Sequence, residues 1–519
     1  MTAFIILQGI KLWLAARVPL FGDEAFYWQE SRHLAFGYSD LPGMTAWLVR
    51  AGQAVGGDSV LGVRWPFLLL GAGLPWLVVA FARRHVDARR AWQAGLLALA
   101  LPLAGSLGVL ALPDVMLTVA AVLALLALDA ALARDRWRDW LLLGVALALA
   151  WMTHYRAAML MLAGLAFCVA TPRGRDAWRR PGLYLALALA VAGMLPLLIY
   201  NLGHGWAGLD FQAVQRNPWR FHADALVQPL EQALVCTPLL YVLLVWALCH
   251  ATARARRGAP WDLIASSAMT FMLGYFLFGL FADDTHFRLH WPLPGYLPLL
   301  VVVPLLAAEW WQRRSARLAI RIALAAAFAL AAAGQAAVLA YLALASTPAR
   351  ASLLAGTKAY PKAFAPWGRV GALARQLLAQ PPQSGDLLVA DNFRLAAELD
   401  FALRGARRVY SLDSPANTKH GRAPQLAQWR LDETALRQAH AGDTVLLVVA
   451  ETEMRQDRRI PWLRSICSRF DSIEPLQRLE FAGGARRFAF YRARLRAAPG
   501  PVDGDTCVVW LHAWAAQKR

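Results

Sequence analysis

Residues 140–171 read WLLLGVALALAWMTHYRAAMLMLAGLAFCVAT, an apolar run that is too long for one membrane helix. About 20 helical residues are enough to cross the apolar core of a bilayer. The run is interrupted by the polar tetrad Thr153-His154-Tyr155-Arg156. We therefore expect two short, tilted spans that are joined by a hinge at this tetrad.

Apolar stretches of spanning length recur from the first residue to about position 346, which predicts a polytopic α-helical membrane protein. The chain is 58% hydrophobic and 17% charged, whereas soluble proteins have roughly 45–50% and 25%. This composition excludes a disordered chain, a disulfide scaffold and an ordinary soluble enzyme. Nine further spans bring the predicted total to about eleven, and they lie near residues 2–20, 60–82, 91–110, 115–133, 181–200, 226–249, 262–281, 293–311 and 320–346.

The net charge of +19, from 53 basic and 34 acidic residues, is a signal of orientation. Every second loop between the spans is rich in arginine, as the positive-inside rule requires of cytoplasmic loops. The N-terminus is then inside, and eleven crossings place the C-terminus outside. Nucleic acid is not expected as a partner, because the charge is divided among short inner loops. These loops carry Arg83, Arg84, Arg89 and Arg90, then Arg134, Arg136 and Arg138, then Arg173, Arg175, Arg179 and Arg180, then Arg254, Arg256 and Arg257, then Arg313, Arg314 and Arg317.

Beyond residue 346 the composition changes to that of a small α/β domain. We expect residues 1–346 to form a transmembrane domain and residues 347–519 to form a soluble domain on the outer side. Cys467 and Cys507 are candidates for a disulfide if this domain faces an oxidising compartment. The β-like runs lie at 387–390, 408–410, 444–449 and 488–491, and helical stretches lie at 393–403 and 423–439.

The first outer loop, residues 21–59, holds the strongest candidates for chemistry. It begins with Phe21-Gly22-Asp23-Glu24-Ala25-Phe26-Tyr27-Trp28, in which two adjacent carboxylates precede three aromatic residues. One interpretation is an interfacial aromatic belt with solvated acids. The other is a partly desolvated carboxylate that acts as a general base on a hydroxyl acceptor. The loop is long, which is typical of functional loops, and we expect helices that lie on the membrane surface within it.

This loop resembles the first periplasmic loop of GT-C glycosyltransferases. More narrowly, it is similar to the bacterial relatives of protein O-mannosyltransferases and of the lipid A aminoarabinose transferase. The resemblance covers about the first 310 residues well and the tail more loosely. Its motifs are Gly22-Asp23-Glu24-Ala25-Phe26-Tyr27-Trp28, Gly37-Tyr38-Ser39-Asp40-Leu41-Pro42, Pro113-Asp114, His154-Tyr155, Asn201-Leu202-Gly203-His204-Gly205-Trp206 with Phe211-Gln212, and His290-Trp291-Pro292-Leu293-Pro294.

The resemblance implies a GT-C fold and an inverting glycosyltransferase of the bacterial inner membrane. Such an enzyme moves a hexosyl or pentosyl unit from a polyprenyl-phosphate carrier, undecaprenyl phosphate, to an acceptor on the periplasmic face. An envelope glycolipid such as lipid A is the expected acceptor, and a protein is the other. By the same resemblance, Asp23 takes the catalytic position with Glu24 beside it. Because a polyprenyl phosphate is already a good leaving group, the reaction needs a base, cations for the departing phosphate and an apolar groove.

Outer-face cations are the candidates for binding the donor phosphate, since arginine makes bidentate contacts with phosphate. These cations are Arg288, His290, Arg216 and Arg156. The candidates for contacting the acceptor or the sugar, or for ordering the loop, are Asp40, Asp114, Tyr27, His204, Trp206 and Trp291. Structural alternatives remain open: interfacial snorkelling for the arginines, a helix N-cap for Asp114 and an aromatic belt for the tryptophans.

Two positions depart from the pattern of the relatives. Leu41 and Gly43 stand where relatives commonly carry a basic residue and a proline. The loss of a basic residue at position 41 puts the geometry of the donor site in question. No cofactor is indicated. A divalent metal site is left open by the outer acids Asp23, Glu24, Asp40 and Asp114.

Two other classes of function are alternatives to the enzyme. A transporter or flippase for a lipid-linked sugar would place ionisable residues and broken helices near the bilayer midplane. Here the acids cluster at the outer ends of the spans, apart from Asp129 near the inner end of its helix, which favours chemistry at the surface. A non-catalytic envelope-assembly protein is compatible with Leu41, and its cellular phenotype would survive the substitution Asp23→Asn.

Overall fold

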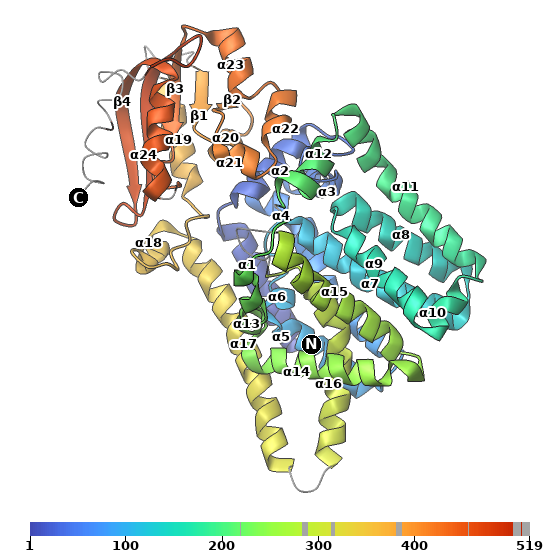
Figure 1. Ribbon diagram of the computed structural model, residues 1–519. Helices are drawn as coiled ribbons and strands as arrows, with labels where there is room; N and C mark the ends of the chain where they lie inside the picture. Colours follow the sequence, from blue (N-terminus) through green and yellow to red (C-terminus); the bar gives the residue numbers. More distant parts are fainter. Residues whose placement is uncertain are drawn as a thin grey trace. The chain divides into compact units, whose positions relative to one another are not determined.

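Every predicted span corresponds to an apolar helix in the computed structural model, which describes residues 1–217, 219–282, 289–312, 317–379, 387–454, 456–501 and 510. Figure 1 shows these helices as the blue-to-yellow part of the chain. They are α1 (Thr2–Arg17), α4 (Val60–Ala82), α5 (Ala88–Ala100), α7 (Pro113–Arg134), α8 (Trp137–Thr153), α9 (Ala157–Ala170), α11 (Pro181–Gly203), α14 (Pro238–Arg254), α15 (Trp261–Ala282), α16 (Leu293–Gln312) and α17 (Arg317–Ala345).

Seven helices within the described ranges are long and apolar enough to cross a membrane. An eighth crossing results if α1 and α2 (Gly22–Arg32), which meet at 75°, form one broken span. The helices α1, α5, α8 and α9 are shorter, with 16, 13, 17 and 14 residues. The chain is therefore a multi-pass membrane protein, as predicted. The count of eleven spans and the orientation stay predictions.

The polar tetrad breaks the long apolar segment where the sequence predicted a hinge. Helix α8 ends at Thr153, and His154 is extended, with φ −160° and ψ 144°. The Thr153 hydroxyl donates to the Leu149 carbonyl at 2.6 Å. The Arg156 N–H donates to His154 Nδ1 at 3.0 Å. These bonds satisfy polar groups at the break, and Arg156 is left at the start of α9.

An ionic network joins the ends of several helices on the side that carries the arginine-rich loops. Asp129 of α7 accepts from Arg84 Nε at 2.5 Å and lies 3.0 Å from His85 Nε2. Arg173 lies 3.5 Å from the same carboxylate and 2.9 Å from Asp262 of α15. Asp129 is only 1% exposed, so its charge is stable only while these cations surround it.

The remaining helical elements are short and connect the long helices. They are α3 (Met44–Gly56), α6 (Pro102–Gly105), α10 (Pro172–Ala177), α12 (Ala207–Asp210), the π-helix η1 (Phe211–Gln215), the 3-10 helices η2 (Ala223–Val227), η3 (Ala255–Arg257) and η5 (Ser352–Leu354), α13 (Gln228–Cys236) and α18 (Pro348–Ala351).

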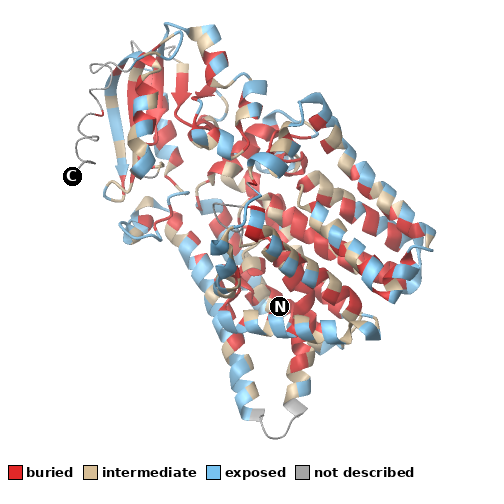
Figure 2. Cartoon of the chain, viewed as in Figure 1, coloured by how far each residue is buried: buried red, intermediate tan, exposed pale blue. Residues whose placement is uncertain are grey.

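The chain forms two compact units from interleaved segments. The helical unit contains Met1–Ala15, Ala35–Gly52 and Arg64–Tyr341. The sheet unit contains Ala16–Leu34, Gln53–Val63 and Leu342–Arg519, so parts of the first outer loop pack with the tail. In Figure 2 much of α7 and α16 and the inner strands of the sheet are coloured as buried, whereas much of α17 and of the edge strand β4 is exposed.

The tail contains a mixed sheet of five strands in the order β2-β1-β3-β5-β4. β1 is parallel to β2 and β3, and β5 is antiparallel to β3 and β4. One face packs on α19 and α20 and the other on α23 and α24. The strands are β1 (Leu387–Ala390), β2 (Val409–Ser411), β3 (Thr444–Val449), β4 (Phe470–Phe481) and β5 (Arg486–Leu495), and the helices are α19 (Trp367–Ala379), α20 (Phe393–Ala402), α21 (Pro415–Lys419), α22 (Ala423–Gln428), α23 (Glu433–His440) and α24 (Gln456–Cys467).

The structure describes one of the two cysteines that were expected to form a disulfide in the tail. Cys467, at the end of α24, is disulfide-bonded. Cys507, the expected partner, lies outside the described residues.

Candidate active site

The two adjacent carboxylates of the first outer loop have different surroundings. Both lie in the first turn of α2, which begins after the extended residue Phe21. Glu24 is fully buried, and its Oε2 accepts the Phe21 backbone N–H at 2.9 Å. Glu24 thus satisfies a backbone donor at the start of the helix, which is the structural part of a capping box. The Asp23 side chain is 22% exposed and faces the cations of the tail.

Three basic side chains of the sheet unit surround Asp23. Arg422 Nη2 lies 3.5 Å from Asp23 Oδ1. Arg394 Nη2 lies 2.7 Å from His420 Nε2, and both of these groups also interact with the Asp23 carboxylate. Burial raises the pKa of Asp23, but the guanidinium charges of Arg422 and Arg394 hold it below its ordinary value. Asp23 is therefore a carboxylate at neutral pH, which is the state that a general base needs.

His420 is held in its neutral form by its surroundings. Burial lowers the pKa of its imidazole, and the neighbouring guanidinium groups of Arg394 and Arg422 lower it further, although Asp23 opposes them. A neutral His420 ring can accept a hydrogen bond from the Arg394 guanidinium at Nε2. The positive charge beside Asp23 is therefore carried by the two arginines.

A second cluster, in the helical unit, combines four of the residues that the sequence singled out. Asp114 lies in the first turn of α7, directly after Pro113. Its Oδ1 is 2.5 Å from Arg156 Nη2 and 3.1 Å from His290 Nε2. The Arg156 guanidinium lies over the Trp291 ring at 5.1 Å. We call Asp114, Arg156, His290 and Trp291 the polar cluster.

Arg216 and Asp40 connect to this cluster through side chains of η1 and the Trp291 ring. The Arg216 guanidinium lies 5.5 Å from the Trp291 ring centre. Arg216 donates to Gln212 Oε1 at 3.3 Å, and Gln212 Nε2 donates to the Asp40 carbonyl at 2.8 Å. The structure thus places Arg216 on the same aromatic ring as Arg156, and it ties the Asp40 turn to η1.

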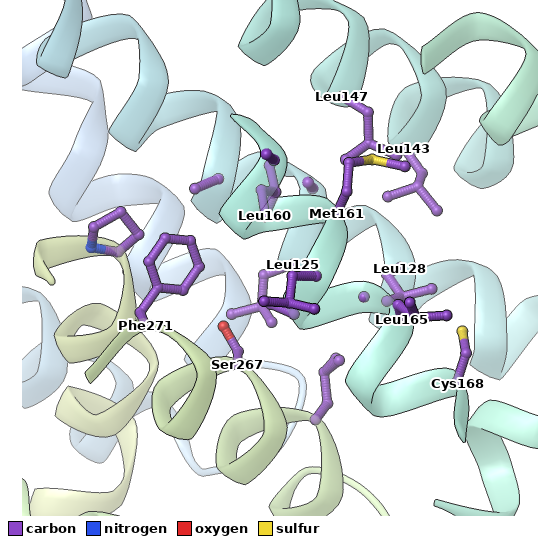
Figure 3. Close-up of a pocket in the computed structure, with 18 of the residues that line it drawn as sticks. Leu125, Leu128, Leu143, Leu147, Leu160, Met161, Leu165, Cys168, Ser267 and Phe271 are labelled. Carbon is purple, nitrogen blue, oxygen red and sulfur yellow. The ribbon is translucent and has the colours of Figure 1, made fainter. Parts of the chain in front are cut away.

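An apolar cavity of about 400 Å³ opens beside the polar cluster, between α7, α8, α9, α11 and α15. Figure 3 shows Leu160 and Phe271 at one end of it and Cys168 at the other. Leu160 and Phe271 also line the small pocket that contains Asp114, Arg156, His290 and Trp291. The cavity and the polar cluster therefore share walls, an arrangement that suits a molecule with an apolar chain and an anionic head.

The other predicted residues lie elsewhere. His204 stacks on Tyr200, with the ring centres 4.2 Å apart, and its Nδ1 lies 2.8 Å from the Tyr200 carbonyl. Trp206 is 44% exposed, and Tyr27 is buried beneath the Arg422 guanidinium in the sheet unit. Arg288, the remaining predicted phosphate ligand, lies outside the described residues.

Leu41 and Gly43, the two departures from the pattern of the relatives, both lie in closely packed surroundings. Leu41 is buried, with 4% exposure, in the short turn closed by the bridge between Gly37 and Pro42. An added Cβ at Gly43 would lie 2.6 Å from the Ala35 carbonyl oxygen, so this site has no room for a side chain. Glycine at position 43 is thus matched to this turn.

The outer acids named as a metal alternative belong to different units. Asp23 and Glu24 lie in the sheet unit, and Asp40 and Asp114 lie in the helical unit. Asp23 and Asp114 each face arginine and histidine side chains. In the part of the chain that the structure describes, no three His, Cys, Asp or Glu side chains are grouped in a way that could hold a metal ion.

Arg394 and Arg422 lie at the site, but the sequence analysis assigned no role to either of them. The structure places Arg422, which follows α21, beside Asp23. Arg394 had no local signal, because nothing near it in the sequence resembles a motif. Both contacts depend on chain pairing over nearly 400 positions, which a single sequence does not reveal.

Comparison with known proteins gives one family match and one curated relative. The family model described as dolichyl-phosphate-mannose-protein mannosyltransferase matches residues 40–200. A lipid A galacturonosyltransferase, RgtD, from Rhizobium johnstonii is 26% identical over 431 residues, which are 79% of this chain and 84% of that protein. The region that matches the family model includes Asp114 and Arg156 of the polar cluster.

Solved structures share the fold. ArnT from Cupriavidus metallidurans in the apo state has a TM-score of 0.67 at 16% identity, with 94% of this chain and 97% of that chain covered. The same protein bound to undecaprenyl phosphate has a TM-score of 0.63 at the same identity and coverage. An oligosaccharyltransferase from Archaeoglobus fulgidus has a TM-score of 0.52 at 12% identity, with 99% and 77% covered. The predicted resemblance and the predicted fold class are confirmed.

Proposed function

We propose that this chain, a polyprenyl-phosphate-sugar-dependent glycosyltransferase of the GT-C type related to protein O-mannosyltransferases and ArnT, transfers a sugar from undecaprenyl phosphate to lipid A. The transfer takes place on the periplasmic face of the inner membrane. The similarity to the lipid A galacturonosyltransferase supports the acceptor. The fold shared with ArnT, which has been solved with undecaprenyl phosphate, supports the donor.

The observation that carries the proposal is the polar cluster at the wall of an apolar cavity. A polyprenyl chain needs an apolar environment, and its phosphate needs cations. Arg156 supplies a cation and His290 an imidazole ring, and both side chains contact the same oxygen of Asp114. Arg216, on the same Trp291 ring as Arg156, adds positive charge. We assign the donor phosphate to these side chains and the isoprenoid chain to the cavity of Figure 3.

Asp23 is the general base of the proposed reaction. The acceptor hydroxyl gives its proton to the Asp23 carboxylate while its oxygen forms a bond to the anomeric carbon. The bond from that carbon to the phosphate oxygen breaks, and undecaprenyl phosphate leaves with the electron pair. Attack from the face opposite the phosphate inverts the anomeric configuration. His204 and Trp206, whose side chains are exposed, are assigned to contacts with the sugar or the acceptor.

Reconstitution tests both substrates directly. The full-length protein in liposomes is supplied with lipid A and with undecaprenyl phosphate that carries galacturonic acid or aminoarabinose. We expect glycosylated lipid A and free undecaprenyl phosphate in equal amounts by mass spectrometry, and neither product with Asp23→Asn. Movement of the intact donor across the bilayer without product would favour the flippase instead. Product from a protein acceptor but not from lipid A would contradict the proposed acceptor.

A further inference from the structure

We propose that Arg422, supported by Arg394, is a positioning residue that fixes the Asp23 carboxylate and keeps it ionised. The inference deepens the proposed function and rests on the role of Asp23 as the base. It concerns the sheet unit alone, which contains both α2 and the tail. It gives the tail domain a task in the reaction.

Arg422 is inserted into one face of α2. Its side chain is 3% exposed, and its Nη1 donates to Glu30 Oε1 at 3.2 Å while Nη2 faces Asp23 at 3.5 Å. Asp23 and Glu30 are seven positions apart, which is about two helical turns, so they lie on the same face of α2. One guanidinium therefore bridges both acids and fixes the rotation of the helix that carries the base.

Aromatic rings hold the Arg422 guanidinium from the sides. It lies 4.2 Å from the ring centre of Phe26, 5.2 Å from that of Tyr27 and 5.8 Å from that of Phe393. Arginine is suited to this position because its planar group can stack on rings and bridge two carboxylates at once. A lysine would keep the charge but would lose the bridge and most of the stacking.

The tail anchors Arg422 at the carboxyl edge of its parallel strands. The Arg422 N–H donates to the Asn417 carbonyl at 2.8 Å. Asn417 is 1% exposed, accepts the Phe393 N–H at 2.9 Å and donates to Ser411 Oγ at 3.1 Å. Phe393 and Ser411 lie at the start of α20 and the end of β2. In α/β proteins this edge is where ligands bind, and here it holds the helix of the base.

Arg394 supplies the second cation from the first turn of α20. Its Nη1 donates to Glu453 at 3.4 Å, and its Nη2 to His420. An added Cβ at Gly22 would lie 3.1 Å from Arg394 Cγ, so a glycine next to Asp23 makes room for this side chain. The charge around the base thus depends on residues from α20, from the α21–α22 segment and from the loop after β3.

The charged groups that face Asp23 determine the expected pH dependence. Arg394 faces it from α20, and His420 and Arg422 face it from the α21–α22 segment. Glu24 follows it on its own helix, while Glu30 and Glu453 are bound to the two arginines. Loss of Arg422 removes the strongest cationic effect on Asp23, so the pKa of Asp23 rises. Activity that needs the carboxylate is then lost at a higher pH than in the wild type.

The test measures the pH dependence of sugar transfer by the full-length protein in liposomes. We expect Arg422→Gln to lower kcat by about ten- to a hundredfold, with little change in the KM for the donor, and to move the acidic limb of the profile to higher pH. Arg422→Lys should restore the position of that limb in part. Arg394→Gln should move it in the same direction by a smaller amount. Arg492→Gln is the matched control, because Arg492 pairs with Glu474 on the sheet, away from Asp23.

The outcomes separate this inference from the proposed function. An inactive Asp23→Asn together with an Arg422→Gln variant that keeps the wild-type kcat and pH profile would overturn the role of Arg422 alone. An active Asp23→Asn variant would show that Asp23 is not the base, and the inference about Arg422 would fail with it. If Arg422→Gln does not fold, the pH profiles of Arg422→Lys and Arg394→Gln test the proposal instead. An unshifted acidic limb in both of these variants overturns the proposal.

Discussion

At the scale of single residues, the two adjacent carboxylates of α2 have different surroundings, a difference that the sequence alone does not reveal. Glu24 accepts a backbone N–H at the helix start, whereas Asp23 faces Arg422. A glutamine at the Glu24 position can also accept this bond. We therefore expect Glu24→Gln to keep most of its transfer activity. Asp23→Asn, the isosteric change one residue away, should lose about 10²- to 10⁴-fold in kcat. Equal losses in both variants would contradict the division of roles.

A second prediction at this scale concerns the donor phosphate. Arg156→Gln removes a cation that is held by Asp114 and Trp291. We expect the affinity for undecaprenyl phosphate to fall by roughly 30-fold or more, about 2 kcal/mol, as measured by native mass spectrometry of the detergent-solubilised protein. Arg179→Gln is the control, because Arg179 is exposed and pairs with Asp176. Unchanged affinity after Arg156→Gln would exclude the polar cluster as the phosphate site.

At the scale of elements, the sequence was most informative where apolar length or periodicity is strong. The strands 387–390 and 444–449 coincide with β1 and β3, and the break between α8 and α9 falls on the polar tetrad. β4 was not predicted, because its burial is irregular and Pro475 lies at a register shift against β5. Arg422 and its partner Glu30 are 392 positions apart. Contacts of this kind follow from the assembled sheet, not from local pattern.

A prediction at the element scale concerns the Asp129 network, which joins α7, α10, α15 and the turn after α4 through Arg84 and Arg173. Asp129→Asn leaves these partly exposed cations without the buried carboxylate that they share. Breaking a buried ion pair costs about 3–5 kcal/mol, so thermal unfolding in detergent should begin at a clearly lower temperature. Asp87→Asn is the control, because Asp87 is half exposed and pairs with nearby Arg90. Equal stability of the two variants would show that the network contributes little.

At the scale of the whole molecule, charge and apolar length predict a topology that fusions can test. The arginine-rich loops should be cytoplasmic and the tail periplasmic. Alkaline phosphatase, which is active only in the periplasm, is fused after residue 257 and after residue 360. We expect activity only from the second fusion. The reverse pattern would overturn the orientation, and activity from neither fusion would overturn the periplasmic tail.

The two compact units divide the proposed chemistry between them. The sheet unit contains Asp23, the proposed base, and its arginines, and the helical unit contains the polar cluster and the apolar cavity. The sequence predicted a membrane domain followed by a soluble one, because composition changes near residue 346. It did not predict that residues 16–34 and 53–63, which include parts of the first outer loop, pack with the tail. This exchange allows the tail to hold the helix of the base.

The central claim, sugar transfer to lipid A with Asp23 as the base, is tested most directly by mass spectrometry of lipid A. Lipid A is compared from the wild type, from a deletion strain, and from that strain carrying either the wild-type gene or Asp23→Asn. We expect one glycoform to disappear in the deletion strain, to return with the wild-type gene and to stay absent with Asp23→Asn. Identical lipid A in all four strains would contradict the claim.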